Sequence, residues 1–253
     1  MAGLVGTSTS DDGPRRPVFI CGCGHSGTTL LLRTLQRVDG LAGPSVESNW
    51  ALSASLPRRM DALARLEAAV GATCRLVEKT PVHIVHLDRL LEARPVCQIL
   101  LCMRDVRDVV ASRKARGERV DQATQKWLEA ARVARRYEQD QRIMVVKYEH
   151  LVGSQHEQAA ALSSLSTFLG VIVTTDHLVP GTDSGREPFN RIVAPVEKPT
   201  VVNTRAGHGA LRAWQFNQPL YDGRNRWQTE LSRPEVHFIE GAATESLRYF
   251  GYQ

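Results

Sequence analysis

The sequence has little of what membrane-spanning, disulfide-rich or nucleic-acid-binding proteins need. No stretch of its 253 residues approaches the roughly 20 apolar residues of a membrane span, and no basic segment followed by an apolar core opens it. Five cysteines are an odd number, and their spacing does not suggest zinc. No Lys/Arg run with interleaved aromatics occurs. We therefore expect a cytoplasmic protein that binds no nucleic acid, while the net charge of +5 favours an anionic ligand.

Short apolar runs alternate with helical patterns along the chain. Four runs predict buried strands, at residues 17–23, 74–79, 96–103 and 142–148. Helix-start signals follow at Thr80-Pro81, Ser154-x-x-Glu157 and Ser232-x-x-Glu235. This alternation predicts an α/β fold, a P-loop-like, doubly wound sheet of about four to five parallel strands flanked by helices in a single domain.

Three further segments have distinct compositions. Residues 1–15 are small and polar, and we expect a disordered tail before one domain at 16–253. Residues 48–70 predict one or two helices broken near Pro57. Residues 176–208 are rich in proline, and we expect loops that cover bound ligands.

The stretch "CGCGHSGTTLL" at residues 21–31 is built like a phosphate loop without its lysine. Gly22 and Gly27 have the spacing of the loop glycines, but Thr28 stands where ATP-binding loops have lysine. Backbone N–H groups and the hydroxyls of Ser26, Thr28 and Thr29 can hold an anion. A tight strand–helix turn without a ligand is the alternative, and the three glycines beside three hydroxyls favour the anion.

Cations follow two of the other predicted strands. Arg104 ends the third strand, and Ser112 and Arg116 follow at helical spacing, so the three could bind a second phosphate. A solvated helix with Asp–Arg pairs is the alternative for this segment. Lys79 ends the second strand and could supply the positive charge that Thr28 cannot.

These segments together resemble the sulfotransferases that use 3′-phosphoadenosine 5′-phosphosulfate (PAPS), particularly the branch containing tyrosylprotein sulfotransferases. The resemblance covers residues 17–252. It rests on "HSGTTLL" (25–31), Glu47, "EKTP" (78–81), "RDVRDVVAS" (104–112), "KYEHLV" (147–152), "FLGV" (168–171), "KPTVVN" (198–203) with Trp214, and "LRYFGY" (247–252).

The resemblance implies transfer of a sulfuryl group from PAPS to a hydroxyl acceptor, in line and without a metal, leaving adenosine 3′,5′-bisphosphate. It implies Glu47 as the general base, Lys79 on the bridging or transferred group, and His25 as a further catalytic residue that binds the 5′-phosphosulfate. Residues 198–214 are expected to fold over the cofactor. The implied cofactor-binding residues are Gly24, His25, Ser26, Gly27, Thr28, Thr29, Leu30, Arg104, Ser112, Arg116, Tyr148 and Asn203.

Two positions depart from the tyrosylprotein branch. His25 stands where that branch has arginine, and Glu78 stands where it has an uncharged residue. Glu78 either orients Lys79 or is a solvated carboxylate. His83 is close enough to Lys79 in sequence to be an alternative base, although a structural histidine is the simpler interpretation.

Several alternatives stay open at this point. An ATP-dependent small-molecule kinase would need the missing loop lysine, and a non-catalytic nucleotide-binding scaffold would not need Glu47 or Lys79. The acceptor is a phenolic or tyrosyl group, a sugar or a natural product, and the sequence does not choose among them. The sequence also leaves homodimer formation open.

Overall fold

The computed structural model describes residues 16–44, 46–178 and 220–252. The predicted tail at 1–15, most of the predicted cover at 176–208, and both Asn203 and Trp214 lie outside these residues. The expectations for those positions therefore stay predictions.

Five parallel strands form one sheet in the order β2-β3-β1-β4-β5. The four predicted strands are confirmed as β1 (Val18–Gly22), β3 (Arg75–Lys79), β4 (Gln98–Met103) and β5 (Ile143–Lys147). β2 (Leu41–Ala42) was not predicted, because a strand of two residues has no apolar run to identify it. β4 is buried along its whole length, as its continuous apolar sequence predicts.

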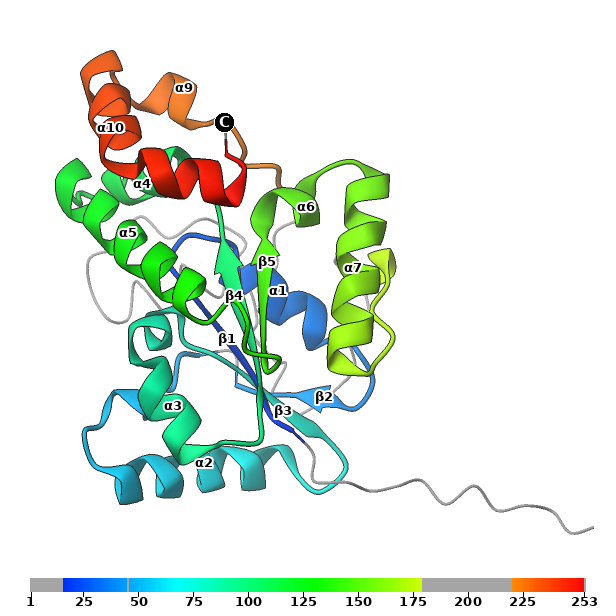
Figure 1. The fold of residues 1–253 in the computed structure, drawn as a ribbon. Coiled ribbons are helices and arrows are strands. Elements are labelled where there is room, and N and C mark those ends of the chain that lie inside the picture. The colour runs from blue at the N-terminus through cyan, green and yellow to red at the C-terminus, as the bar shows by residue number, and fades with distance from the viewer. Residues whose placement is uncertain (1–15, 45, 179–219, 253) are drawn as a thin grey trace, which may run out of the picture.

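Helices cover both faces of the sheet (Figure 1), which confirms the doubly wound α/β prediction. One face carries α1 (Thr28–Leu35) and α7 (Gln155–Leu169). The other face carries α2 (Leu56–Val70), α3 (Leu87–Ala93), α4 (Val106–Lys114), α5 (Val120–Arg136) and α10 (Arg233–Phe250). Side chains of β1 alternate between the two cores: Val18 and Ile20 face α1 and α7, while Phe19 and Cys21 face the other layer.

Short elements connect these layers: η1 (Trp50–Leu52), η2 (Pro81–His86), α6 (Tyr148–Val152), η3 (Thr175–His177) and α9 (Trp227–Glu230). The predicted start at Thr80-Pro81 opens the 3-10 helix η2, which α3 then continues. The prediction of one or two helices at 48–70 broken near Pro57 is confirmed, since η1 ends at Leu52 and α2 begins at Leu56. Pro57 lies in the first turn of α2, where the missing N–H costs no hydrogen bond. The capping boxes at Ser154 and Ser232 are both formed.

The carboxyl ends of parallel strands meet at one edge of the sheet. Lys79 is the last residue of β3, and the loop at 23–27, Arg104 and Tyr148 follow β1, β4 and β5, so all four lie at this edge. β2 and β3 lie on one side of β1, and the later strands β4 and β5 lie on its other side, so the strand order reverses at β1. Open α/β sheets bind their ligands at such a point, outside the carboxyl ends of the strands.

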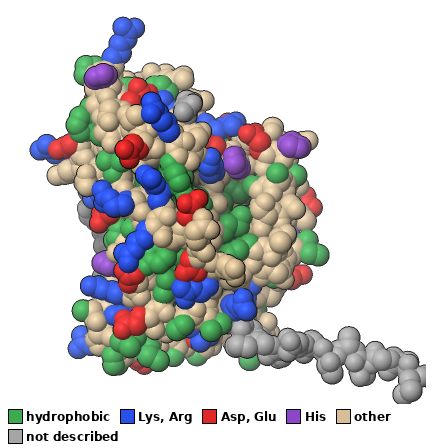
Figure 2. All heavy atoms as spheres, in the orientation of Figure 1, with side chains coloured by type: hydrophobic (Ala, Val, Ile, Leu, Met, Phe, Trp, Pro, Cys, Tyr) green, Lys and Arg blue, Asp and Glu red, His purple; other side chains and the backbone are tan. Residues whose placement is uncertain are grey.

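Acidic and basic side chains are interspersed on the face shown in Figure 2. Among the described residues, no helix combines the length and the hydropathy that crossing a membrane requires.

Candidate active site

The loop after β1 is shaped by residues with left-handed backbone conformations. His25 has a φ of 77° and Gly27 a φ of 89°, and the Ser26 N–H donates to the Cys23 carbonyl at 3.1 Å. A Cβ at position 27 would lie only 2.6 Å from Cδ2 of Tyr148. Glycine is therefore required at position 27 both for its backbone conformation and for the close approach of the Tyr148 ring.

The loop and the neighbouring Arg104 contain polar groups that have no partner in the described part of the protein. Ser26 is 1% exposed, and its Oγ makes no hydrogen bond to any described group. The buried Nε of Arg104 likewise has no partner there. Buried polar atoms are normally satisfied, so these two orphans beside the N-terminus of α1 fit an anionic ligand.

Residues expected at the two phosphate sites lie together. His25 Nδ1 is 2.9 Å from the Ser112 hydroxyl oxygen, and Nη1 of Arg104 donates to the His25 carbonyl at 3.3 Å. The loop after β1 is thus tied to α4 and to the end of β4. The structure brings these residues into one site, and their binding roles stay predictions.

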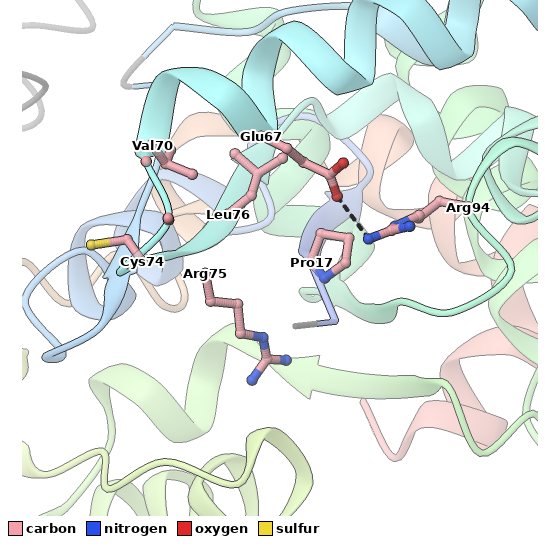
Figure 3. A pocket seen from close by; sticks show the side chains of 9 residues that line it. Pro17, Glu67, Val70, Cys74, Arg75, Leu76 and Arg94 are labelled. Atoms are coloured by element: carbon pink, nitrogen blue, oxygen red, sulfur yellow. Dashed lines mark ion pairs between the residues drawn. The ribbon is translucent and has the colours of Figure 1, made fainter. Parts of the chain in front are cut away.

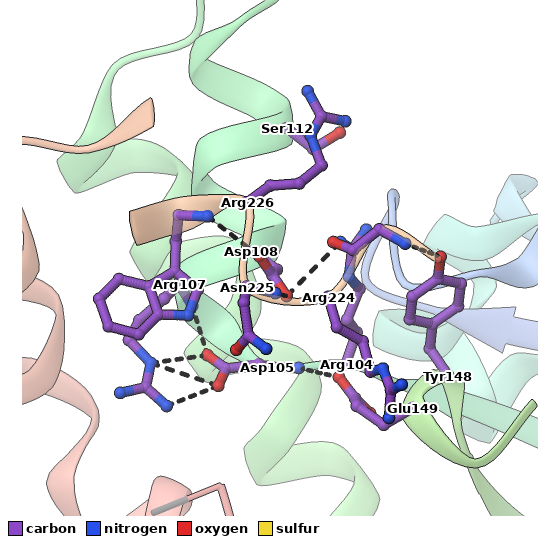
Figure 4. Close-up of polar contacts among 12 residues, drawn as sticks. Arg104, Asp105, Arg107, Asp108, Ser112, Tyr148, Glu149, Arg224, Asn225 and Arg226 are labelled. Atoms are coloured by element: carbon purple, nitrogen blue, oxygen red, sulfur yellow. Dashed lines mark hydrogen bonds and ion pairs between the residues drawn. The ribbon is translucent and has the colours of Figure 1, made fainter. Parts of the chain in front are cut away.

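Arg104 is covered by the chain itself (Figure 4). Its guanidinium carbon lies 4.5 Å from the centroid of the Tyr148 ring, and its Nη2 donates to the Gly223 carbonyl. The Tyr148 hydroxyl accepts from the Gly223 N–H at 3.0 Å and donates to the Tyr221 carbonyl at 2.9 Å. Arg104 and Tyr148 therefore hold residues 221–223 across the carboxyl edge of the sheet.

Asp108 fixes the next residues of that segment. Its carboxylate accepts from the backbone N–H groups of Asn225 at 3.0 Å and Trp227 at 3.2 Å, and it lies 3.6 Å from Nη2 of Arg104. Burial raises the pKa of Asp108, against the opposing effect of Arg104 and the two backbone donors. The sequence analysis did not predict this segment; the run "DGRNR" at 222–226 is the signal that could have found it.

Two other arginines follow Ser112. Arg113 donates to Glu118 at 2.7 Å. Its Nη2 lies 3.7 Å from the Cys23 sulfur, and a Cβ at position 24 would lie 3.0 Å from the same Nη2. Arg113 thus packs against the loop, which the sequence analysis missed. Arg116 lies past the end of α4 and is exposed.

The predicted base and the predicted lysine form an ion pair. Lys79 Nζ lies 2.9 Å from Oε1 of Glu47, with side-chain exposures of 3% and 17%. Lys79 ends β3 and is paired in register with Ile20 of β1, two residues before the loop glycine Gly22. A buried cation and a partly exposed carboxylate therefore lie beside the anion loop.

Glu78 and His83 are both fully buried. Glu78 accepts from the hydroxyl of Ser48 at 2.7 Å, so the alternative of a solvated carboxylate is wrong. Burial raises the pKa of Glu78. Burial also lowers the pKa of His83 to about 3, and its Nε2 accepts from the Ala51 N–H at 3.3 Å.

A separate hollow of about 230 Å³ lies at the amino ends of the strands (Figure 3). Its charged lining is already paired, since Glu67 and Arg94 lie 3.0 Å apart and Arg75 donates to the Leu169 carbonyl at 2.7 Å. This hollow is at the sheet edge opposite the site. Within the described residues, no three His, Cys, Asp or Glu side chains form a group that could hold a metal.

Comparison with known proteins gives a consistent result. Residues 58–175 match the sulfotransferase family. The sulfotransferase domain of the Synechococcus PCC 7002 olefin synthase superposes with a TM-score of 0.62 at 15% identity, over 94% of this chain and 98% of that one. The sulfotransferase domain from the curacin biosynthetic pathway gives 0.60 at 18% identity, over 90% and 97%.

A third structure similar to this chain holds a nucleotide. Retinol dehydratase, solved with androsterone and the inactive cofactor PAP, superposes with a TM-score of 0.50 at 12% identity, over 92% of this chain and 82% of that one. No curated protein sequence matches the chain. At these identities the superpositions establish the fold.

Proposed function

We propose that this chain, which matches the sulfotransferase family over residues 58–175 and shares the fold of sulfotransferase domains, transfers a sulfuryl group from PAPS to a hydroxyl acceptor. The observation that carries the proposal is the convergence of the loop after β1, Arg104, Ser112 and Tyr148 at one edge of the sheet. A nucleotide with phosphates at both its 5′ and 3′ positions needs two neighbouring anion sites, and the residues at this edge would form both.

The residues present fit such a cofactor. The unsatisfied Ser26 hydroxyl and the loop N–H groups would hold the 5′-phosphosulfate, while Arg104, Ser112 and Arg116 would hold the 3′-phosphate. Tyr148 would lie near the nucleotide, and Asn203 is carried over from the family resemblance alone. When bound, the cofactor supplies the sulfuryl group. The retinol dehydratase complex with PAP supports this kind of cofactor on this fold.

The missing loop lysine is consistent with this chemistry. A sulfuryl group carries one negative charge, whereas a terminal phosphoryl group carries about two near neutral pH. Lys79 is buried at the end of the strand next to β1 and would meet the smaller charge together with the backbone N–H groups of the loop. Charge stabilisation and positioning would then do most of the catalysis.

Glu47 suits the role of general base better than His83. The acceptor hydroxyl must lose its proton as the new bond forms, so the base needs a free lone pair at the site. Glu47 is partly exposed beside Lys79, whereas His83 is fully buried and its Nε2 already accepts from Ala51. The low pKa of His83, about 3, also makes it a weak base.

The test is transfer of radiolabelled sulfate from PAPS to a panel of acceptors containing a phenol, a tyrosine peptide, a sugar and an alkyl alcohol. Label in at least one acceptor, absent without enzyme, is the expected result. Label in none of them, together with no binding of adenosine 3′,5′-bisphosphate, would contradict the proposed function. The member of the panel that is labelled identifies the acceptor class.

A further inference from the structure

The segment that carries Glu47 lacks regular backbone pairing, and side chains of the "EKTPVH" stretch (78–83) replace it. The Ser48 N–H points at Oε1 of Glu78 at 3.4 Å, and the Asn49 N–H donates to Oγ1 of Thr80 at 3.3 Å. The Ala51 N–H donates to Nε2 of His83. Backbone N–H groups in or near a core need acceptors, and here three of them find side chains from one stretch.

Glu78 is the hub of this arrangement. Its Oε1 also accepts from the Thr80 hydroxyl at 2.5 Å and from the Ser48 hydroxyl at 2.7 Å. Its Oε2 lies 3.6 Å from Nδ1 of His83. Because the Ala51 N–H donates to Nε2, the proton of the neutral imidazole lies on Nδ1 and faces the carboxylate.

All groups directed at Glu78 are therefore hydrogen-bond donors. The carboxylate accepts from the hydroxyls of Ser48 and Thr80, whereas Nδ1 of His83, at 3.6 Å, faces it without a hydrogen bond. A glutamine of the same shape would present its own NH2 group to one of these donors. The hydroxyl of Thr80 donates its hydrogen to Glu78 and accepts from the Asn49 N–H, so it links the carboxylate to the backbone of Asn49. Loss of the carboxylate would thus disturb the Ser48, Thr80 and His83 contacts together.

This hub lies next to the proposed catalytic pair in sequence and on the opposite side of the strand. Glu78 and Lys79 are successive residues of β3, so their side chains point to opposite faces of the sheet. Glu47 and Ser48 are likewise successive. One carboxylate, Glu78, holds the segment through Ser48, and the other, Glu47, meets Lys79 at 2.9 Å.

We propose that Glu78 is a positioning residue that holds residues 48–51 against the end of β3 and thereby sets Glu47 on Lys79. The proposal rests on the proposed function, because it is that function which makes Glu47 the base. The anchor itself is a statement about this chain's own contacts and is tested without cofactor or acceptor.

The test is a double-mutant cycle on urea unfolding with the full chain: wild type, Glu47→Gln, Glu78→Gln and the double variant. If Glu78 sets Glu47 on Lys79, Glu47→Gln lowers the unfolding midpoint in the wild-type background and changes it little in the Glu78→Gln background. Equal lowering in both backgrounds would overturn the proposal, because it would make Glu78 a structural residue independent of Glu47.

A second pair of variants covers the case in which Glu78→Gln does not fold. Thr80→Val removes the hydroxyl between Glu78 and Asn49 without a change of charge, whereas the control variant Thr80→Ser keeps the hydroxyl. Hydrogen exchange at residues 48–51 should rise at least tenfold in Thr80→Val and return to the wild-type rate in Thr80→Ser. Unchanged exchange in Thr80→Val would contradict the anchor.

Binding of adenosine 3′,5′-bisphosphate separates this proposal from the proposed function. The hydrogen bonds of Glu78 go to Ser48 and Thr80, which lie outside the loop after β1, so its Gln variant should bind the bisphosphate within about twofold of wild type. A tenfold loss would show a general disturbance of the site and would overturn the positioning role. If wild type itself binds none, the proposed function fails, while the unfolding cycle still decides whether Glu78 holds Glu47.

Discussion

Lys79 Nζ lies 2.9 Å from Oε1 of Glu47, with the lysine almost wholly buried and the glutamate partly exposed. The pair joins the end of β3 to a loop 32 residues earlier in the chain. A carboxylate that can accept a proton is therefore in direct contact with a buried ammonium group, beside the loop that follows β1. We derive the first prediction from this pair.

Replacing Glu47 by glutamine should remove the base and keep the shape of the side chain. We expect kcat for the acceptor identified in the panel to fall by about 100-fold or more. Affinity for adenosine 3′,5′-bisphosphate should stay within about twofold, because Glu47 does not belong to the predicted phosphate sites. Glu67→Gln, which removes an ion-paired carboxylate at the opposite edge of the sheet, is the matched control. Unchanged kcat in Glu47→Gln would exclude Glu47 as the base.

Arg104 is the residue whose loss should weaken nucleotide binding most. Each charge-assisted hydrogen bond contributes roughly 1.5–3 kcal/mol, so Arg104→Ala should raise the Kd for adenosine 3′,5′-bisphosphate by at least about 10- to 150-fold. Arg136→Ala on the exposed end of α5 controls for loss of one positive charge. Circular dichroism checks the fold, since Arg104 also contacts Gly223 and Tyr148. An unchanged Kd would remove Arg104 from the phosphate site.

Gly27 should not tolerate a side chain, and Gly117 provides a matched control. The two glycines have nearly equal φ values of 89° and 86°, but only at Gly27 would a Cβ meet another residue, the ring of Tyr148 at 2.6 Å. Gly117→Ala should cost about 1 kcal/mol of unfolding free energy from backbone strain alone. Gly27→Ala should cost clearly more and should also weaken bisphosphate binding. Equal costs at the two positions would contradict the close packing of Tyr148 on the loop.

His83 should make the fold sensitive to mild acid. Its pKa is about 3 in the folded protein and about 6.5 in an unfolded chain, so between these values only the unfolded chain is protonated. The free energy of unfolding should therefore fall as the pH drops below about 6.5, by up to about 1.4 kcal/mol per pH unit.

Urea midpoints from about pH 7 to about pH 5 measure this effect. The decrease should be smaller in His83→Gln and should persist in His86→Gln, because His86 is only partly buried. The same pH slope in wild type and His83→Gln would show that His83 is not the group responsible.

The sequence predicted the features that are encoded locally. The apolar runs of β1, β3, β4 and β5 and the capping boxes at Ser154 and Ser232 depend on neighbouring residues, and all are found. The loop at 23–27 was predicted for the same reason, since glycines and hydroxyls between a strand and a helix are a local pattern. β2 was missed because two residues carry no periodicity.

The features that the sequence did not predict depend on contacts between distant residues. Arg104 meets Gly223 across 119 positions, and Asp108 meets Asn225 across 117. The pairing of Glu47 with Lys79 was not predicted, because the family resemblance implied only a separate role for each residue. The buried state of Glu78 could not be predicted, because it depends on Ser48 and His83 folding over the end of β3.

Calorimetric titration with adenosine 3′,5′-bisphosphate, and separately with ATP and magnesium, tests directly whether the site selects a nucleotide with a 3′-phosphate. We expect tight binding of the bisphosphate and little or no binding of ATP, because ATP has no 3′-phosphate for Arg104 and Ser112. Preference for ATP would contradict the assignment of the 3′-phosphate site and favour a kinase. Binding of neither nucleotide would contradict the proposed cofactor and favour a scaffold without catalysis.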